Sequence, residues 1–235
     1  MKKIALIPAR VESERFYGKL LEKLSGVPVI IRTYKSALET NVFDDVYVVT
    51  HNDEIIDLIK SIDGKYLKSS SGHESGTDRI AEVAIGLKYD IIVNLQGDEP
   101  FIDKSSIQKI VNGFNNKEVK MASLMRDFKD KDELFNPNNV KVIVDKNNYS
   151  INFSRTPMNS EHVNYKHIGV YAFRKEVLIE FSKMDKTLME KKENIECLRY
   201  IENGEKIKMF KTDFSGISID TPEDLIKAEE YLNSQ

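Results

Sequence analysis

Three cations follow the first apolar run of the chain. The segment KIALI (residues 3–7) has the composition of a buried strand, and Arg10, Arg15 and Lys19 come directly after it, with Gly18 beside the lysine. Such charges often mark a solvated loop, since loops run over the protein surface. They equally suit a loop that surrounds a strongly anionic group such as a triphosphate. The rest of the sequence has to decide between these interpretations.

Two aspartates could hold a metal ion beside such an anion. Asp98 in QGDEP follows the apolar run at 90–95, and Asp220 precedes the segment TPEDL. Each could simply cap its own turn, because aspartate side chains often bond to nearby backbone amides. The alternative is Mg²⁺, which takes one or two carboxylates and leaves its other positions to phosphate and water. Together with the three cations, the aspartates suit phosphoryl transfer.

Further polar residues could line a substrate site. The segment HESGTDR (73–79) is either a capped helix start or a polar wall beside a base or sugar. Three glutamates on a predicted helix at about 188–203 have the spacing i, i+3, i+6: Glu190, Glu193 and Glu196. This spacing is typical of a solvated helix face, although the carboxylates could also bind the hydroxyls of an acceptor. Ser154-Arg155 and His167 are additional candidates.

Several other chemistries are excluded by the absence of their motifs. The sequence contains no G-x-x-x-x-G-K-[ST] phosphate loop and no G-x-G-x-x-G after its first strand, which argues against P-loop and dinucleotide-binding folds. Its four histidines and one cysteine have no zinc-ligand spacing. No serine lies in a G-x-S-x-G elbow. Metal-assisted phosphoryl transfer therefore remains the best interpretation of the polar residues.

Apolar runs alternate with amphipathic segments in the first part of the chain. The sequence predicts strands and helices in turn, with strands at 3–7, 46–50 and 90–95 and helices at 28–40, 53–62 and 79–88. This alternation is typical of a mainly parallel α/β sheet that is covered on both faces. Ligands bind such sheets at the carboxyl ends of the strands. We therefore expect Lys19 and Asp98, which follow two of these strands, to face the same site.

The second part of the chain has a different pattern. Strands are predicted without regular helices between them, at 120–127, 140–145, 149–155 and 167–173, which indicates a mixed-sheet extension or a flap of hairpins. A final helix is predicted after Asp220, with Thr221 as N-cap and Pro222 at its first position. Asp220 would then lie between a short strand, GISI (216–219), and this helix.

Composition limits the class of protein and its partners. At 235 residues the chain suits a single domain, and a net charge of −3 from 35 basic and 38 acidic residues gives no basic field for nucleic acid. The single cysteine, Cys197, excludes an internal disulfide and fits a reducing compartment. No apolar run approaches the roughly 20 residues that cross a bilayer. We therefore expect a cytoplasmic protein that binds neither membrane nor nucleic acid.

The motifs, taken together, resemble one enzyme family. The loop IPARVESERFYGK is similar to the signature loop of sugar-nucleotide cytidylyltransferases, and the chain continues with HESGTDR, VNLQGDEP, FNPNNVKVIVD, FSRTP, HIGVYAFR and DTPEDL. In this order they resemble the 3-deoxy-manno-octulosonate (Kdo) cytidylyltransferases, over essentially the whole chain. The resemblance implies a Rossmann-like, glycosyltransferase-A-like nucleotidyltransferase sheet. It also implies CTP and Kdo as substrates, Mg²⁺, a homodimer and a role in lipopolysaccharide synthesis.

The resemblance also assigns residues and regions. It implies a nucleotide-binding half at 1–119, an acceptor and dimerisation part at 120–215, and a metal-site loop and helix at 216–235. Arg10, Arg15, Lys19 and Asp98 match catalytic positions, and Asp98 and Asp220 match the metal ligands. Nucleotide-binding positions are matched by Pro8, Ala9, Arg10, Ser13, Arg15, Lys19, His73, Ser75, Arg79 and Asp98. Acceptor-side positions are matched by Gln96, Arg155, His167, Glu193, Glu196 and Cys197.

The chain departs from the family pattern at a few positions. Phe16-Tyr17 replaces a Leu-Pro pair, His51 replaces an aspartate, and Cys197 replaces a glutamine. If Cys197 faces the acceptor, the loss of the amide predicts that 8-amino-Kdo is used at least as well as Kdo. The alternative is that Cys197 packs in the core, as free cysteines often do. Another ulosonic acid as acceptor, and a catalytically silent nucleotide-binding module, are further alternatives.

Overall fold

In the computed structural model the chain forms two compact units. The structure describes residues 1–13, 15–159, 161–214 and 216–234. The first unit comprises Met1–Ile107 and the C-terminal segment after Phe214, and the second is Gln108–Phe214. The functional division expected at residues 119 and 215 stays a prediction. Among the described residues, no helix is both long enough and apolar enough to cross a membrane.

Parallel strands form the centre of the first unit. They lie in the order β6-β1-β4-β5 and comprise β1 (Lys3–Pro8), β4 (Asp45–Thr50), β5 (Tyr66–Lys68) and β6 (Ile91–Asn94). Leu6 of β1 is in register with Tyr47 of β4 on one side and with Asn94 of β6 on the other. Strands β1, β4 and β6 are nearly continuously buried because helices cover both faces, as their apolar runs predicted, whereas the edge strand β5 is half-exposed.

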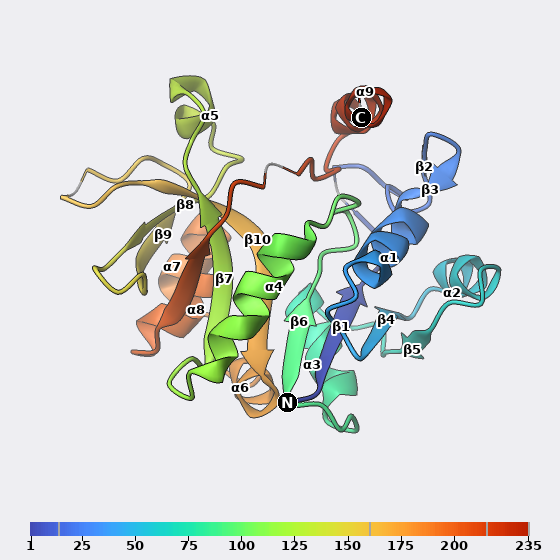
Figure 1. Ribbon diagram of the computed structural model, residues 1–235, viewed down its shortest axis with the longest axis horizontal. Helices are drawn as coiled ribbons and strands as arrows, with labels where there is room; N and C mark the ends of the chain where they lie inside the picture. The colour runs from blue at the N-terminus through green and yellow to red at the C-terminus, as the bar shows by residue number, and fades with distance from the viewer. Residues whose placement is uncertain (14, 160, 215, 235) are drawn as a thin grey trace. The chain divides into compact units, whose positions relative to one another are not determined.

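Helices cover this sheet from opposite sides (Figure 1). The crossovers α1 (Val29–Glu39) and α2 (Asp53–Lys60) lead outward along the sheet, whereas α3 (Gly76–Ala84) returns from β5 to β6. Right-handed crossovers that run in opposite directions place their helices on opposite faces. A small hairpin, β2 (Lys23–Leu24) and β3 (Val27–Pro28), precedes α1. The predicted parallel α/β fold is therefore confirmed.

Helix α3 begins and ends earlier than the predicted range 79–88. Ser75 caps it by accepting a hydrogen bond from the Asp78 amide at 3.1 Å, so that Gly76 is already helical. The helix ends at Ala84, and the Gly86 amide then donates to the Val83 carbonyl at 3.3 Å in a turn. The shift places Arg79 in the first turns of the helix instead of at its start.

The C-terminal helix α9 (Pro222–Asn233) belongs to the first unit. Thr221 forms the expected cap, and it shares a capping box with Asp224. Glu229 accepts from the Ser25 amide at 3.0 Å, and Tyr231 packs edge-on against Phe101 with ring centroids 4.8 Å apart. The expected strand at 216–219 is wrong, since the described segment 216–220 lies outside any strand.

The second unit contains a mixed sheet. Its strands are β7 (Met121–Arg126), β8 (Lys141–Val144), β9 (Ser150–Ser154), β10 (Tyr165–Arg174) and β11 (Ile207–Lys211). β10 runs antiparallel to both β7 and β8, β8 pairs antiparallel with β9, and β11 runs parallel to β7. The four strands predicted in this region are all present. The parallel edge strand β11 was not anticipated, because only five residues carry its pattern.

The helices of the second unit correct two expectations. α5 (Lys131–Phe135) separates β7 from β8, where no helix was expected, and Asp130 caps it by accepting from the Glu133 amide at 2.7 Å. α4 (Lys104–Asn112) begins in the first unit and ends in the second, and the 3₁₀ turn η1 (Gly113–Asn115) and α6 (Lys175–Phe181) lie within the second. The predicted helix at 188–203 is divided into α7 (Leu188–Glu193) and α8 (Cys197–Glu202). Asn194 breaks it by adopting the left-handed conformation, with φ 52° and ψ 51°.

A buried ion pair joins α7 to α8. Arg199 donates from Nε to Glu190 Oε2 at 2.9 Å and from Nη2 to Glu190 Oε1 at 2.7 Å. Both side chains are buried, and the guanidinium lies 5.0 Å from the centroid of the Phe181 ring. Glu190 therefore does not lie on the solvated helix face that its spacing suggested. The bidentate geometry satisfies both carboxylate oxygens where water is excluded.

Arg199→Met should lower the free energy of unfolding by about 3–5 kcal/mol, because it leaves the Glu190 carboxylate buried without its partner. Removing both charges in Arg199→Met with Glu190→Leu should restore part of that loss, since no uncompensated charge remains. Urea unfolding at neutral pH measures both. A double variant as unstable as the single one would show that the loss comes from packing and not from the unpaired charge.

Candidate active site

Lys19 is the centre of the candidate site. Its ammonium group donates to Asp98 Oδ2 and, at 2.9 Å, to Asp220 Oδ1. The lysine side chain is only 14% exposed and that of Asp98 20%. Burial by itself would lower the pKa of Lys19, but the carboxylates of Asp98 and Asp220 outweigh it, and the pKa is raised above its ordinary value. A charged lysine thus holds two aspartates together.

The sheet and one backbone hydrogen bond bring these residues together. Lys19 follows β1 and Asp98 follows β6, and these strands are adjacent and parallel. The Ile219 amide donates to the Asp98 carbonyl at 2.9 Å, which fixes Asp220 beside Asp98 without a strand. Gly97 permits the close approach, because a Cβ at this position would lie 3.1 Å from both the Pro8 carbonyl oxygen and Leu20 Cδ1. The expected convergence of Lys19 and Asp98 is therefore present.

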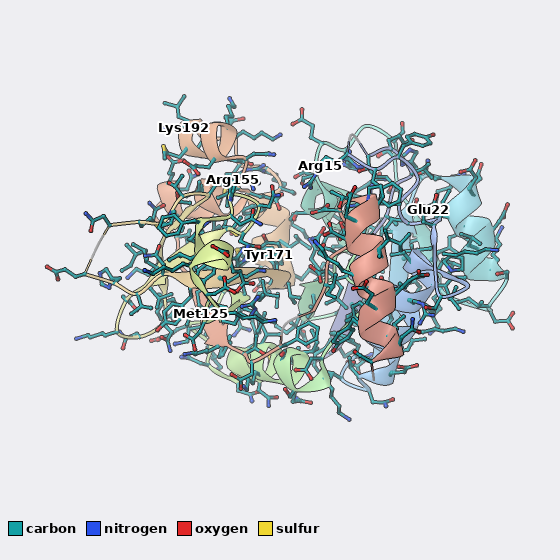
Figure 2. The ribbon with its side chains drawn as sticks, turned by 90° about the horizontal axis from the view of Figure 1, so that it is seen from above. Arg15, Glu22, Met125, Arg155, Tyr171 and Lys192 are labelled. Atoms are coloured by element: carbon teal, nitrogen blue, oxygen red, sulfur yellow. The ribbon has the colours of Figure 1, made fainter. Side chains whose placement is uncertain are left out.

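The loop between β1 and β2 is folded on itself. The Gly18 amide donates to the Val11 carbonyl at 3.0 Å, and Gly18 adopts a φ of 72°, which favours glycine. After this turn the Lys19 side chain is half-buried, whereas Arg10 is exposed. Arg15, labelled in Figure 2, donates to Asp220 Oδ1 at 3.0 Å. The three predicted cations therefore lie on one loop, and two of them contact the same aspartate.

The carboxylates of Asp98 and Asp220 fit a divalent cation of the magnesium type. Both direct oxygens at the Lys19 ammonium, so that two anionic oxygens already converge on one cationic group. Mg²⁺ requires no more protein ligands than this, since phosphate and water complete its octahedron. Among the described residues no cluster of three or more histidine, cysteine, aspartate or glutamate side chains forms a metal cage. The donor set therefore suits an ion that arrives with a phosphate ligand.

The other residues matched to nucleotide binding lie around the same end of the sheet. Pro8 and Ala9 are buried at the end of β1, and the Ala9 amide donates to the Val49 carbonyl at 2.9 Å. Ser13 is half-buried in the loop. Ser75 caps α3, as the sequence suggested, and His73 Nε2 lies 2.7 Å from Glu82 Oε2. Arg79 is 2% exposed and contacts His51 and Ser69.

Gln96 is the one acceptor-side candidate in the first unit. It is half-buried between β6 and Asp98, and its amide donates to Asn94 Oδ1 at 3.2 Å. Asn94 in turn donates to Thr77 Oγ1 at 3.2 Å on α3. The side-chain amide oxygen of Gln96, Oε1, also lies 3.7 Å from the position that a Cβ on Gly76 would take. A chain of polar side chains therefore leads from α3 to the segment of Asp98.

In the second unit, Arg155 and Glu193 bind the protein itself. The Arg155 guanidinium donates to three backbone carbonyls, those of Glu193 at 2.7 Å, Pro137 at 3.1 Å and Asn194 at 3.2 Å. The Arg155 amide donates to Glu193 Oε2 at 2.9 Å. Arg155, labelled in Figure 2, thus ties the end of β9 to the end of α7. Their acceptor role stays a prediction, and these contacts give both residues a structural role as well.

His167 and Cys197 are brought together by a residue that the sequence did not single out. The ring centroids of His167 and Tyr171 are 5.4 Å apart, and Tyr171 hydrogen-bonds to the Cys197 thiol. His167 Nε2 also lies 2.8 Å from Ser123 Oγ. Burial lowers the pKa of His167 to about 4, so the imidazole is neutral at neutral pH. The only sequence signal for Tyr171 was its place four residues after His167 on one strand.

Cys197 is 1% exposed at the start of α8, and burial raises the pKa of its thiol. Glu196 precedes it at the N-cap of α8, outside α7. The three glutamates predicted on one helix are thus distributed differently: Glu190 is in the buried ion pair, Glu193 binds Arg155, and only Glu196 adjoins Cys197. Burial and the bond to Tyr171 favour the interpretation that Cys197 packs inside the unit.

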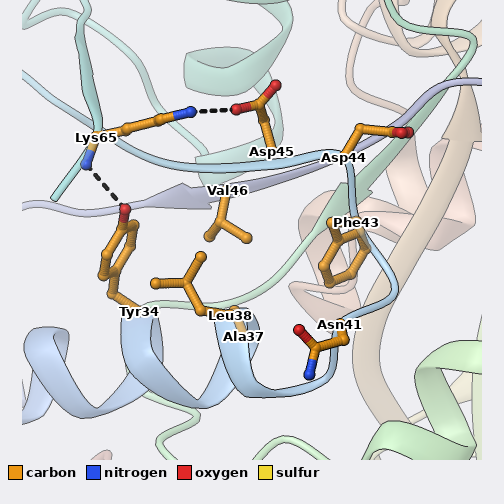
Figure 3. Close-up of a pocket in the computed structure, with 9 residues that line it drawn as sticks. All are labelled: Tyr34, Ala37, Leu38, Asn41, Phe43, Asp44, Asp45, Val46 and Lys65. Carbon is orange, nitrogen blue, oxygen red and sulfur yellow. Dashed lines mark hydrogen bonds and ion pairs between the residues drawn. The ribbon is translucent and has the colours of Figure 1, made fainter.

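A small pocket lies at the other end of the parallel strands. It has a volume of about 180 Å³ and lies between the end of α1 and the start of β4 (Figure 3). Its polar groups bond to one another, since Lys65 pairs with Asp45 at 2.5 Å and the Lys65 amide donates to the Tyr34 hydroxyl at 2.9 Å. None of the predicted site residues lines it. This pocket is therefore separate from the site at Lys19.

Lys19→Ala should lower the free energy of unfolding by about 1–3 kcal/mol without divalent metal, because it leaves two carboxylates together without their charged donor. Added Mg²⁺ should raise the unfolding midpoint of the variant more than that of the wild type. Because the pKa of Lys19 is raised in the folded protein, the contribution of its charge is present below the ordinary lysine pKa and is lost as the pH rises through the folded pKa.

Urea unfolding with and without Mg²⁺ measures this, and Lys23→Ala, an exposed lysine of β2, is the matched control. Equal stabilities for the Lys19 and Lys23 variants would contradict a cation that holds the aspartates together.

Comparison with known proteins identifies the family. The cytidylyltransferase family model matches residues 4–207. The 3-deoxy-manno-octulosonate cytidylyltransferases of Christiangramia forsetii and Flavobacterium johnsoniae are 47% and 48% identical, over 98% and 99% of this chain and 96% and 99% of theirs. A solved structure of CMP:2-keto-3-deoxy-manno-octonic acid synthetase complexed with CTP has 30% identity and a TM-score of 0.93, and the match covers 100% of this chain and 99% of that one. The chain therefore belongs to the 3-deoxy-manno-octulosonate cytidylyltransferase family.

Proposed function

We propose that this chain transfers CMP from CTP to the anomeric hydroxyl of Kdo, releasing pyrophosphate and forming CMP-Kdo. The observation that carries the proposal is the Lys19 ammonium held between Asp98 and Asp220 at the carboxyl ends of β1 and β6. Ligands bind parallel sheets at this end. Relatives named for this reaction, at 47% and 48% identity over nearly the full chain, support the same assignment.

The reaction requires charge stabilisation more than proton transfer by the protein. The anomeric oxygen forms a bond to the α-phosphorus, the bond from that phosphorus to the α,β-bridging oxygen breaks, and the hydroxyl proton leaves to solvent. Negative charge then builds on the departing pyrophosphate. Arg10, Arg15 and Lys19 lie on one loop and supply three positive charges for it. Such preorganised charge is usually the largest contribution to phosphoryl transfer.

We assign Mg²⁺ to Asp98 and Asp220. When bound there, the ion would polarise a phosphoryl oxygen and offset charge on the triphosphate. The role of the protein residues is distinct from this. Asp98 and Asp220 provide the anionic oxygens, and Arg15 and Lys19 restrain Asp220 through two hydrogen bonds to the same oxygen. The pairing keeps the site assembled before substrate binds.

Further residues would contact the nucleotide and the acceptor. His73, Ser75 and Arg79 would form the side of the site near the nucleotide. Gln96, His167 and Glu196 would contact the acceptor, together with Arg155 and Glu193 in positions that the protein's own contacts already restrain. The enzyme would act in the cytoplasm as a homodimer and supply activated Kdo for lipopolysaccharide.

A coupled pyrophosphate-release assay tests the proposed function. With Kdo and Mg²⁺, CTP should support turnover and ATP should not, because a site matched to the edge of cytosine leaves polar groups unpaired against a purine.

Asp220→Asn should lower kcat by about 100-fold or more, since metal ligation acts mainly on the transition state. Glu223→Gln, at the exposed start of α9, is the matched control. Equal turnover with ATP, or an Asp220→Asn variant as active as the control, would contradict the proposal.

Cys197→Gln tests the choice of acceptor. Because the thiol is buried and bonded to Tyr171, we expect the ratio of kcat/KM for Kdo and 8-amino-Kdo to change by less than about 2-fold in this variant. Cys197→Ser, which keeps a small hydrogen-bonding group at this position, is the control. A ratio that moves towards Kdo in Cys197→Gln but not in Cys197→Ser would place residue 197 at the acceptor. It would then favour 8-amino-Kdo as the natural sugar.

A further inference from the structure

His51 bridges two segments that carry predicted nucleotide-side residues. It is the first residue after β4, at the same end of the sheet as the loop that follows β1. Its Nδ1 atom lies 2.8 Å from Nη1 of Arg79 on α3. Its Nε2 atom lies 3.4 Å from Oε1 of Glu12 in the loop. One imidazole ring therefore contacts a cation through one nitrogen and an anion through the other.

The chemistry of the two partners assigns the proton on this ring. A guanidinium group has only donors, so Nδ1 of His51 accepts the hydrogen bond from Arg79 and carries no proton. The neutral ring then has its proton on Nε2, which faces the Glu12 carboxylate. A second proton, on Nδ1, would place two N–H donors and two positive charges against each other. The contact between His51 and Arg79 is thus available only to the neutral ring.

The end of β4 also holds the loop at Glu12. The residue after His51, Asn52, donates from Nδ2 to Glu12 Oε1 at 3.2 Å and accepts from the Val11 amide at 3.2 Å. His51 and Asn52 thus contact the same oxygen of the Glu12 carboxylate, and Asn52 also holds the backbone next to Arg10 through Val11. The position of the cationic loop therefore depends on the two residues that follow β4.

Arg79 keeps its positive charge in this arrangement. It is nearly fully buried, and besides His51 its guanidinium donates to the neutral Ser69 hydroxyl at 2.8 Å and to the Ser70 carbonyl at 3.4 Å. Burial lowers the pKa of Arg79, and the nearby charge of Arg10 lowers it further. Because the His51 and Ser69 acceptors of Arg79 are neutral, its charge and that of nearby Arg10 form a basic region, in which Glu12 and Glu82 are the neighbouring carboxylates. Such a region suits a polyphosphate.

We propose that His51 is a positioning residue for the nucleotide: the neutral ring aligns Arg79 with the loop of Arg10 and Glu12, and protonation of the ring breaks this alignment. The inference rests on the proposed function in one respect, because it takes the anion to be the triphosphate of CTP. His51 does not touch the reacting atoms in this proposal. It acts through Arg79 and Glu12.

Other charged groups could contribute to a pH dependence at this site. Those around His51 and its partners come from the loop, two helices and the segment before α3. They are Glu12 and Arg10 in the loop, Asp53 at the start of α2, Arg79 and Glu82 on α3, and His73 just before α3. Asp53 is paired with Lys68, and Glu82 with His73. The test must therefore separate titration of His51 from titration of His73 and of the substrate phosphate.

The first measurement is the protonation state of the ring, and it needs no catalysis. Nitrogen-15 NMR of the imidazoles at pH 7.5 should show His51, assigned by loss of its signals in His51→Asn, with an unprotonated Nδ1 and a protonated Nε2. A ring protonated on Nδ1 would overturn the proposal. In Arg79→Met, loss of the donor should let the two tautomers become mixed, and an unchanged tautomer would likewise contradict the bridge.

The second measurement is CTP affinity by titration calorimetry at pH 7.5 and pH 5.5. His51→Asn keeps an acceptor near the place of Nδ1 but cannot be protonated, so the affinity of the wild type relative to this variant should fall between pH 7.5 and pH 5.5. His162→Asn, at an exposed histidine of the second unit to which no binding role is assigned, is the matched control, and its ratio to the wild type should stay constant. In the turnover assay the same loss should appear in KM, with kcat nearly unchanged. Parallel affinity profiles for the wild type and His51→Asn would overturn the proposal.

These results are separable from the proposed reaction. A protein that binds CTP as described but releases no pyrophosphate with Kdo would contradict the proposed function and leave the role of His51 supported. Turnover of CTP and Kdo with identical pH profiles in the wild type and His51→Asn would support the proposed function and contradict the role of His51. If CTP binds to neither protein at pH 7.5, both proposals fail.

Discussion

The hydrogen bonds from Lys19 to Asp98 and Asp220 join three segments that lie far apart in the sequence. The loop after β1 supplies the lysine, the segment after β6 supplies one aspartate, and the residue before α9 supplies the other. Two partly buried carboxylates repel each other unless a cation lies between them, because desolvation and like charge both disfavour the ionised pair. The lysine removes this repulsion. The two carboxylates therefore stay ionised side by side at the carboxyl ends of the strands.

In the second unit, buried charged side chains hold the helices in place. Arg199 with Glu190, and Arg155 with Glu193 and three backbone carbonyls, fix the region around α7 and α8. Each charged group is satisfied by several hydrogen bonds, which is what makes burial of a charge tolerable. His167, Tyr171 and Cys197 form a neutral group beside this frame. His167 and Cys197 are both buried, so this neutral group packs inside the unit.

Much of this arrangement could be anticipated from local patterns. The parallel strands β1, β4 and β6 were predicted because their apolar runs have no alternation, and the cap of α9 followed from Thr221, Pro222 and the acidic first turn. The misses have equally local causes. Strand β5 has three residues and helix α5 has five, too few for a periodic pattern. The break between α7 and α8 depends on the left-handed conformation of Asn194, which a helical spacing of glutamates does not reveal.

By itself the sequence determined the residue types at the site, the strands that they follow and the family to which the chain belongs. These depend on periodicity and on ordered motifs, both of which are local. Only the tertiary structure decided which side chains meet. It paired Asp220 with Asp98 through a backbone bond from Ile219, placed Tyr171 between His167 and Cys197, and set His51 between Arg79 and Glu12. These contacts join residues 4 to more than 100 positions apart, and no short sequence pattern encodes them, because they arise from the packing of whole elements.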